Sequence, residues 1–176
     1  MAPEQVRLSG VNYFYMNRKI GNTGRYLEKF LNWFDCTVYP CKRNCVYHTE
    51  IVRSFPRYVV KNGRKSIRRP SKKEIFESVQ SNILSDETEL IKPKVLLLIG
   101  NTAYVTFYKY FLKRDIENNL TRETERISES GEYYVYDGIP VIPIQHSSGV
   151  NPRFNLMLRN QKLIDMIVGI LDCKSK

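Results

Sequence analysis

Apolar positions recur at helical spacing in several parts of the chain. In residues 24–34 (GRYLEKFLNWF) they are three or four residues apart, which predicts an amphipathic helix with Thr23 as its N-cap. Ser71 and Glu74 have the spacing of a capping box, in which two side chains satisfy each other's backbone amides. A second helix is therefore expected to begin there and to fray near Ser85.

Other stretches have the patterns of strands. Residues 94–100 (KVLLLIG) and 139–144 (IPVIPI) are continuously apolar, which is typical of parallel strands buried on both faces. A turn is expected at 137–138 (DG), and residues 45–54 (CVYHTEIVRS) are expected to form a further strand. Apolar residues at helical spacing predict a last helix over 154–171.

Helices that alternate with buried strands predict a three-layer α/β/α fold with a short central parallel sheet. Residues 1–176 are expected to form one such domain, because the chain shows no internal repeat and no low-complexity stretch. Ligands of such sheets bind beyond the carboxyl ends of the strands. The segments that follow Ser54, Gly100 and Ile144 are therefore the places where we expect a site.

The charge balance adds an argument about partners. The chain has 28 Lys and Arg against 18 Asp and Glu, a net charge of +10 that favours polyanions such as nucleic acid. No apolar run reaches the roughly 18 residues that a membrane span needs, and the amino terminus lacks the apolar core of a secretory signal. We expect a protein of the cytoplasm (nucleoid-associated) or nucleus that is not secreted and has no membrane partner.

Residues 57–73 (RYVVKNGRKSIRRPSKK) are the one sharp change in composition. One interpretation is a solvated loop. The other is a basic arm that contacts DNA phosphates through Arg64, Lys65, Arg68 and Arg69. Both interpretations stay open on the sequence alone.

The cysteines do not form a recognised metal-binding set. Cys36, Cys41 and Cys45 have the spacing C-x4-C-x3-C, Cys173 lies far from them in the sequence, and only His48 stands near. We expect no metal, and cysteines that are either small buried hydrophobic residues or partners in a disulfide.

Polar residues concentrate where the last strand ends. Residues 145–153 (QHSSGVNPR) follow a buried strand and precede a helix. A single histidine in such a place is usually structural, but the company of Ser147, Ser148 and Asn151 favours a catalytic role for His146. Ordinary turn chemistry is the competing explanation for the two serines.

The stretch IPVIPIQHSSGVNPRF resembles the final motif of the uracil-DNA glycosylase superfamily, a His-Pro-Ser or His-Pro-Ala loop after the last strand. The resemblance is closest to the thermophile-type, iron–sulfur branch and covers nearly the whole chain in order. The segments that match this branch are the first helix at 21–31, the second strand at 49–56, a helix start at 69–78, and the third strand with its helix at 89–107.

This resemblance implies an enzyme that flips a nucleotide out of DNA and hydrolyses the N-glycosidic bond of uracil or a related damaged base. By position, His146 would donate a hydrogen bond to the uracil O2, which gains negative charge as the bond breaks. Glu4, or its neighbour Gln5, would position water, and Phe14 or Tyr13 would stack on the base. The implied enzyme acts as a monomer on single-stranded or duplex DNA, with no cofactor and no metal.

The resemblance also assigns the rest of the final loop to DNA. Ser147, Ser148 and the amides of the Gly149 turn would hold phosphates, and Val150 stands where the family places an apolar wedge that fills the vacated space. Asn151 and Arg153 would add contacts to the DNA backbone.

The sequence departs from the family pattern in three places that affect the expected activity. The implied first strand lies upstream of Ala2, so we expect a misassigned or truncated start and a domain without that strand. Glu50 stands where active relatives carry an Asn that reads uracil, and an ionised carboxylate suits an N–H-rich edge, as in cytosine-like or adenine-like lesions. Ser54 and Ser78 stand at two cluster-cysteine positions, so no iron–sulfur cluster is expected.

Two other functions remain open. One is a catalytically inactive nucleic-acid-binding protein of the same fold, which Glu50 and the missing strand favour. The other is a nucleotide-binding domain that uses residues 100–103 (GNTA) at a helix N-terminus. In either enzyme or binding domain, Asn101 is expected to contact the base or nucleotide.

Overall fold

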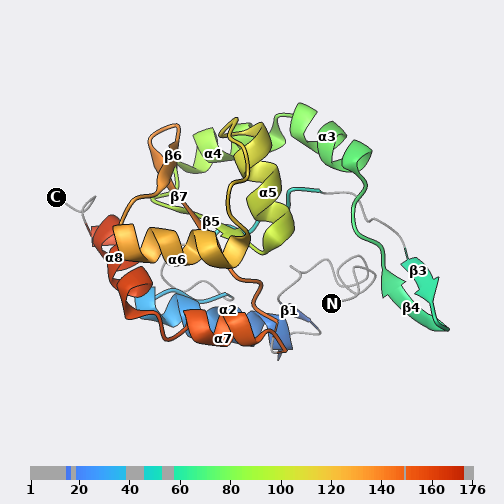
Figure 1. Cartoon of the computed structure of the whole chain (residues 1–176), viewed down its shortest axis with the longest axis horizontal. Coiled ribbons are helices and arrows are strands. Elements are labelled where there is room, and N and C mark those ends of the chain that lie inside the picture. The colour runs from blue at the N-terminus through green and yellow to red at the C-terminus, as the bar shows by residue number, and fades with distance from the viewer. Residues whose placement is uncertain (1–14, 17–18, 39–45, 53–57, 149, 173–176) are drawn as a thin grey trace.

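The computed structural model describes residues 15–16, 19–38, 46–52, 58–148 and 150–172 (Figure 1). Its central sheet has the strand order β5-β7-β6. Strand β7 (Ile139–Ile144) lies in the middle, parallel to β5 (Leu96–Ile99) and antiparallel to β6 (Tyr134–Tyr136). The sheet of the described residues is therefore short, as predicted, but mixed rather than purely parallel.

The two continuously apolar segments are neighbouring parallel strands, as predicted. Leu96 lies opposite Val141 and Ile99 lies opposite Ile144. All six residues of β7 are buried, because this strand has a partner on each side and helices over each face. A central strand that is buried on both faces is therefore apolar at every position and does not alternate with polar residues.

Helices cover both faces of the sheet, which confirms the three-layer arrangement (Figure 1). On one face, Ile142 and Ile144 pack against helices α2, α7 and α8. On the other face, Val141 and Leu98 pack against α5. Five helices surround the sheet in this way: α2 (Asn22–Leu31), α5 (Asn101–Tyr110), α6 (Leu120–Ser130), α7 (Pro152–Met157) and α8 (Gln161–Asp172).

The remaining elements lie around this body. They are two antiparallel hairpins, a 3₁₀ turn and two further helices: β1 (Tyr15–Met16) with β2 (Lys19–Ile20), η1 (Asn32–Phe34), β3 (Tyr58–Lys61) with β4 (Arg64–Ile67), α3 (Lys72–Gln80) and α4 (Ile83–Ile91). No helix among the described residues is long and apolar enough to cross a bilayer.

The predicted helix starts are largely confirmed. The helix expected over 24–34 is α2 followed by η1, although its N-cap is Gly21 and not Thr23. The capping box is present: the Glu74 amide donates to Ser71 Oγ at 3.2 Å, and the Ser71 amide donates to a Glu74 carboxylate oxygen at 2.7 Å.

Two predicted helices are in fact pairs of helices. The helix that begins after Ser71 ends at Gln80, where Asn82 adopts a left-handed conformation (φ 55°), and α4 then continues past the expected fray at Ser85. The helix expected over 154–171 breaks before Asn160, whose side-chain oxygen accepts from the Leu163 amide and starts α8. The apolar periodicity is thus interrupted by a left-handed residue at Asn82 and by a side-chain cap at Asn160.

The strand expected over 45–54 is wrong where the structure describes it, because residues 46–52 are irregular. Side chains hold this segment in place of a strand partner. Tyr47 and Thr49 both donate to the Glu87 carboxylate of α4, at 2.6 and 2.8 Å, and Ser78 of α3 donates to the Ile51 carbonyl at 2.5 Å. The β-branched and aromatic residues that suggested a strand are thus used in packing and polar contacts against helices.

A buried polar cluster fastens α6 beneath the sheet. The Glu123 carboxylate accepts hydrogen bonds from Tyr108 (3.1 Å), Asn118 (3.1 Å) and Arg126 (2.8 and 3.1 Å). Burial alone would raise the pKa of Glu123, but these hydrogen bonds and the Arg126 charge hold it below its ordinary value. Burial, with the nearby Glu123 charge, raises the pKa of Tyr104 to about 12, so the tyrosines around Glu123 remain neutral donors.

We predict that Glu123→Gln lowers the free energy of unfolding at pH 7 by about 1–3 kcal/mol, because the amide cannot accept all four bonds and leaves buried donors unsatisfied. Because the pKa of Glu123 is lower in the folded state, the ionised carboxylate stabilises the fold above about pH 4.5. This contribution to stability is lost as the pH falls below that value. The variant should therefore lose less stability than the wild type between pH 7 and pH 3. Urea unfolding at both pH values measures this.

The matched control is Glu129→Gln, on the exposed face of the same helix, which should stay within about 0.5 kcal/mol of the wild type. Equal unfolding free energies for Glu123→Gln and the control at pH 7 would contradict the structural role of the cluster.

Candidate functional site

The carboxyl ends of β5 and β7 meet at one edge of the sheet. The Gly100 amide donates to the carbonyl of Ile144, the last residue of β7, at 2.9 Å and extends the pairing by one residue beyond the end of β5. The segments that follow Gly100 and Ile144 therefore lie together, as expected for parallel neighbours. The third expected segment, after Ser54, falls outside the described residues.

The His146 side chain packs directly against Gly100. A Cβ atom added at Gly100 would lie 3.3 Å from His146 Cβ and 3.5 Å from His146 Cδ2. Gly100 also has φ 86° and ψ 169°, a conformation that only glycine adopts without strain. Close approach and backbone conformation therefore both require glycine at this position.

His146 lies above the start of helix α5, for which Gly100 is the N-cap. The residue is exposed as a whole, but its packing desolvates part of the imidazole, and this burial lowers the pKa of His146 below its ordinary value. Near pH 7 the ring is consequently neutral, with one nitrogen that donates and one that accepts. Asn101, in the first turn of α5, is exposed at the same edge.

Asn151 closes the loop that carries His146. Its side-chain amide donates to the His146 carbonyl at 2.9 Å, while its side-chain oxygen accepts from the Arg153 amide at 3.2 Å. Its backbone amide donates to the Ser148 carbonyl at 2.9 Å. One residue thus caps helix α7 and fixes the backbone at His146. The sequence carried the signal for this cap, an Asn before a Pro at the first helical position.

The two serines of the loop have different surroundings. Ser147 is fully buried (0% exposed), and its hydroxyl has no hydrogen-bond partner among the described residues. Ser148 is half-buried. Further along, the Val150 side chain is 91% exposed and Arg153 is exposed, whereas Gly149 lies outside the described residues.

Several other predicted site residues also lie outside the described part of the chain, namely Glu4, Tyr13 and Phe14. Glu50 is described and exposed. The backbone of Arg64 and Lys65 belongs to β4, and their side chains are not described. Arg69 is exposed, whereas Arg68 is paired with Glu74 and is treated below.

The cysteines add no metal site to the described structure. Cys36 is half-buried and its thiol donates to the Phe34 carbonyl at 3.3 Å. Cys41, Cys45 and Cys173 lie outside the described residues. Within the described ranges, no group of three His, Cys, Asp or Glu side chains could hold a metal ion.

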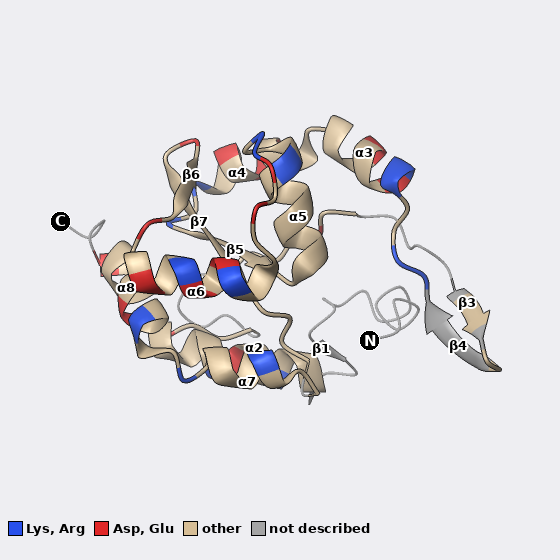
Figure 2. Ribbon diagram, viewed as in Figure 1, with Lys and Arg blue, Asp and Glu red and all other residues tan. Residues whose placement is uncertain are grey.

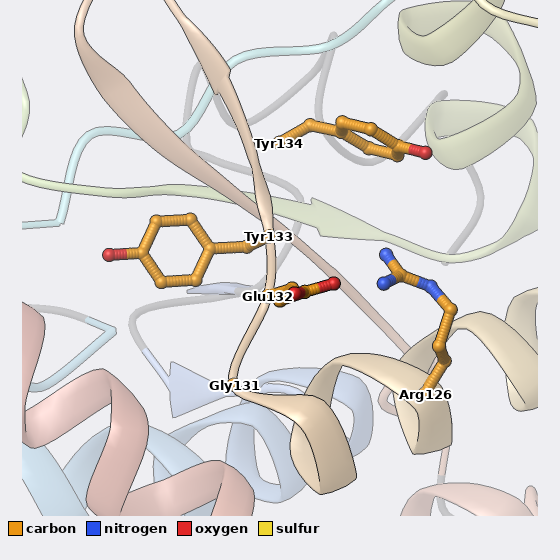
Figure 3. Close-up of a pocket in the computed structure, with 5 residues that line it drawn as sticks. All are labelled: Arg126, Gly131, Glu132, Tyr133 and Tyr134. Atoms are coloured by element: carbon orange, nitrogen blue, oxygen red, sulfur yellow. The ribbon is translucent and has the colours of Figure 1, made fainter.

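A surface hollow lies elsewhere, between the end of α6 and β6 (Figure 3). It is lined by Arg126, Gly131, Glu132, Tyr133 and Tyr134, and the two tyrosine side chains point to opposite sides of β6. The Arg114 and Arg126 guanidinium groups lie 4.2 and 5.7 Å from the Tyr134 ring centre. Arg126 also pairs with Glu123, and the lining does not include the loop of His146.

A three-layer α/β/α fold with a neutral histidine and polar loop at the carboxyl edge of its parallel strands defines the class, an α/β protein of the kind that binds ligands at that edge. The family model of the uracil DNA glycosylase superfamily matches residues 12–167. The chain belongs to the uracil DNA glycosylase superfamily. No curated protein matches the chain individually.

The family match confirms the resemblance seen in the sequence motifs. It supports a glycosylase-like function in general, in the setting of DNA repair and with DNA as the partner. The branch, the base and the roles of individual residues remain predictions.

We predict that Gly100→Ala displaces His146 or strains the start of α5. The positive φ and the 3.3 Å approach to His146 Cβ should lower the free energy of unfolding by about 1–3 kcal/mol. The chemical shifts of the His146 ring, measured by NMR, should change as well.

The matched control is Gly169→Ala on α8, where an added Cβ meets nothing within 4 Å. This substitution should be neutral or stabilising, because alanine favours helices over glycine by up to about 1 kcal/mol. A Gly100→Ala variant as stable as this control would contradict the close packing described here.

Proposed function

We propose that this protein is a DNA glycosylase that extrudes uracil or a related damaged base and hydrolyses its N-glycosidic bond. The observation that carries the proposal is the placement of His146, a neutral imidazole held at the edge of the sheet by Gly100 and Asn151. The family match supports the reaction class.

Cleavage of an N-glycosidic bond leaves the departing base with the bonding electrons and the sugar with positive charge. A hydrogen-bond donor at the base oxygen stabilises this state more than the intact nucleotide. We assign that donor to His146, because its lowered pKa keeps the ring neutral and leaves one N–H to donate. The N-terminus of α5 adds a partial positive charge at the same edge, with Asn101 positioned to contact the base.

The water that attacks the sugar is assigned to Glu4, and the stacking ring to Phe14 or Tyr13, by resemblance to the family. These assignments complete the reaction: the C–N bond breaks, water adds its oxygen to the sugar, and its proton is taken up by the carboxylate. No step of this hydrolysis calls for a cofactor.

We assign the DNA contacts of the final loop from the exposure of its side chains. Val150, 91% exposed beside His146, suits the apolar wedge that occupies the space left by an extruded base. We assign phosphate contact to Ser148, to the Gly149 turn and to Arg153, since the Ser147 hydroxyl is fully buried. Asn151 serves chiefly to hold the loop, because both ends of its side-chain amide bond to the protein backbone.

We predict that the wild type releases uracil from single-stranded and duplex DNA, and that His146→Ala lowers the single-turnover rate by about 10²–10³-fold, the usual effect of removing one such donor. Alkaline cleavage of abasic sites measures the rate. His146→Gln, which keeps an N–H donor, should recover part of the loss. DNA affinity of both variants should match the wild type.

The same assay separates the proposal from its alternative. A wild type that binds DNA tightly and salt-sensitively but cleaves nothing would establish the catalytically inactive binding protein that Glu50 suggests. Including hypoxanthine, xanthine and mismatched uracil among the substrates tests whether the Glu50 carboxylate selects an N–H-rich base edge.

We also predict different effects at the two serines. Ser148→Ala should weaken DNA binding by about five- to tenfold through the loss of a hydrogen bond to a charged phosphate. Ser147→Ala should leave DNA affinity unchanged and raise the free energy of unfolding by up to about 1–3 kcal/mol, because it removes a buried, unsatisfied hydroxyl. Binding isotherms and urea unfolding measure these effects. Equal losses of affinity would mean that DNA binding exposes Ser147.

A further inference from the structure

The β3–β4 hairpin projects from the body of the protein (Figure 1). Its strands pair antiparallel, with Tyr58 opposite Ile67 and Lys61 opposite Arg64. Asn62 and Gly63 have φ 51° and 71°, the left-handed pair that closes a tight two-residue turn. The segment expected to be a loop or an arm is thus an ordered ribbon whose strands pack chiefly on each other.

Most of the excess positive charge of the chain belongs to this segment. Residues 57–73 contain eight Lys and Arg and no Asp or Glu, whereas the other residues contain 20 Lys and Arg against 18 Asp and Glu. The net charge of +10 is therefore a local property of the ribbon and its root. Figure 2 shows this charge continuing from the end of β4 into the start of α3.

An ion pair fixes the root of the ribbon to helix α3. The Arg68 guanidinium donates to both Glu74 carboxylate oxygens, at 2.5 and 2.8 Å, and Glu74 also closes the capping box with Ser71. The hydrogen bond from Arg68 is the main reason that the pKa of Glu74 falls to about 2. The pair therefore holds above about pH 4.5 and is lost only as the pH falls toward 2.

This pairing changes the role expected of Arg68, which anchors the ribbon and is not free for a phosphate. Arg69, the next residue, is exposed. Val60, within β3, is 71% exposed, so this apolar side chain is not buried against the body. A two-stranded hairpin without a core is marginally stable alone, which is typical of an element that gains its contacts from a partner.

We propose that the β3–β4 ribbon is a second DNA-contacting element, which lies along the phosphates of the duplex beside the extruded nucleotide. A four-residue strand spans about 13 Å, a length over which duplex DNA carries about eight phosphate charges. In Figure 1 the ribbon and the orange segment between β7 and α7 both lie to the right of the sheet. The ribbon supplies affinity without base recognition, and the proposal rests on DNA as the partner of the proposed enzyme.

The test neutralises the ribbon and compares it with a matched control. The ribbon variant carries Lys61→Gln, Arg64→Gln and Lys65→Gln. The control removes the same charge at the opposite end of the sheet from His146, where β5 begins and α5 ends, through Lys92→Gln, Lys109→Gln and Lys113→Gln. Binding to an undamaged 20-base-pair duplex is measured by fluorescence anisotropy between 50 and 200 mM salt.

The ribbon variant should bind at least about tenfold more weakly at 100 mM salt, and the slope of log affinity against log salt should fall by about three, one for each lost phosphate contact. The control should keep the wild-type slope to within about one. A ribbon variant that matches the control in slope and affinity would overturn the proposal.

A second variant controls for effects of the substitutions on folding. Because Tyr58 and Ile67 are paired neighbours, residues 58–67 can be replaced by two glycines, and the thermal unfolding of this variant should match that of the wild type. It should show the same loss of DNA affinity as the ribbon variant. Unchanged affinity in the shortened protein would overturn the proposal independently.

Single-turnover kinetics at saturating protein distinguish this proposal from the proposed function. The ribbon variant should release base at the wild-type rate once bound, whereas His146→Ala should bind normally and release base slowly. A wild type that binds through the ribbon without cleaving leaves the ribbon proposal supported and the glycosylase proposal overturned.

Discussion

The main-chain pairing between β5 and β7 is the interaction on which the candidate site depends. It continues one residue past the end of β5, through the Gly100 amide and the Ile144 carbonyl, so that helix α5 starts where the last loop starts. Because Gly100 has no side chain, His146 can rest directly on this start. The histidine is thus positioned by sheet geometry and by the absence of a Cβ at Gly100.

The loop itself is held by its own backbone and by Asn151. The side chain of Asn151 bonds to the His146 carbonyl at one end and to the Arg153 amide at the other, so the cap of α7 also fixes the histidine backbone. In this arrangement Val150 is exposed and Ser148 is half-buried, while Ser147 is buried with an unsatisfied hydroxyl. A loop that holds one unfavourable buried group for the sake of its shape is consistent with a site under functional constraint.

The sequence predicted the elements whose burial is complete and failed where side chains replace main-chain pairing. β7 was predicted because a strand buried along its whole length is apolar throughout, and the half-buried β5 beside it is apolar as well. Residues 46–52 resembled a strand, yet Glu87 and Ser78 hold them through side-chain hydrogen bonds that no periodicity reveals. The short edge strand β6 was not predicted at all. In the site, the position of His146 followed from the loop after β7, but the need for glycine at 100 depends on a close approach visible only in three dimensions.

The structure also separates two requirements that glycosylases must meet together. Extruding a base costs a few kcal/mol of unstacking, and the chemical step needs a small, well-ordered donor site. The site at the sheet edge contributes few charges, since His146 is neutral and Asn101 is an amide. In the proposed glycosylase, the energy for holding a distorted duplex is assigned to charges elsewhere in the chain, and the only segment of the sequence with a large local excess of charge is 57–73. Arg68 and Glu74 anchor that segment to helix α3, and neither residue contacts the loop of His146 through these hydrogen bonds.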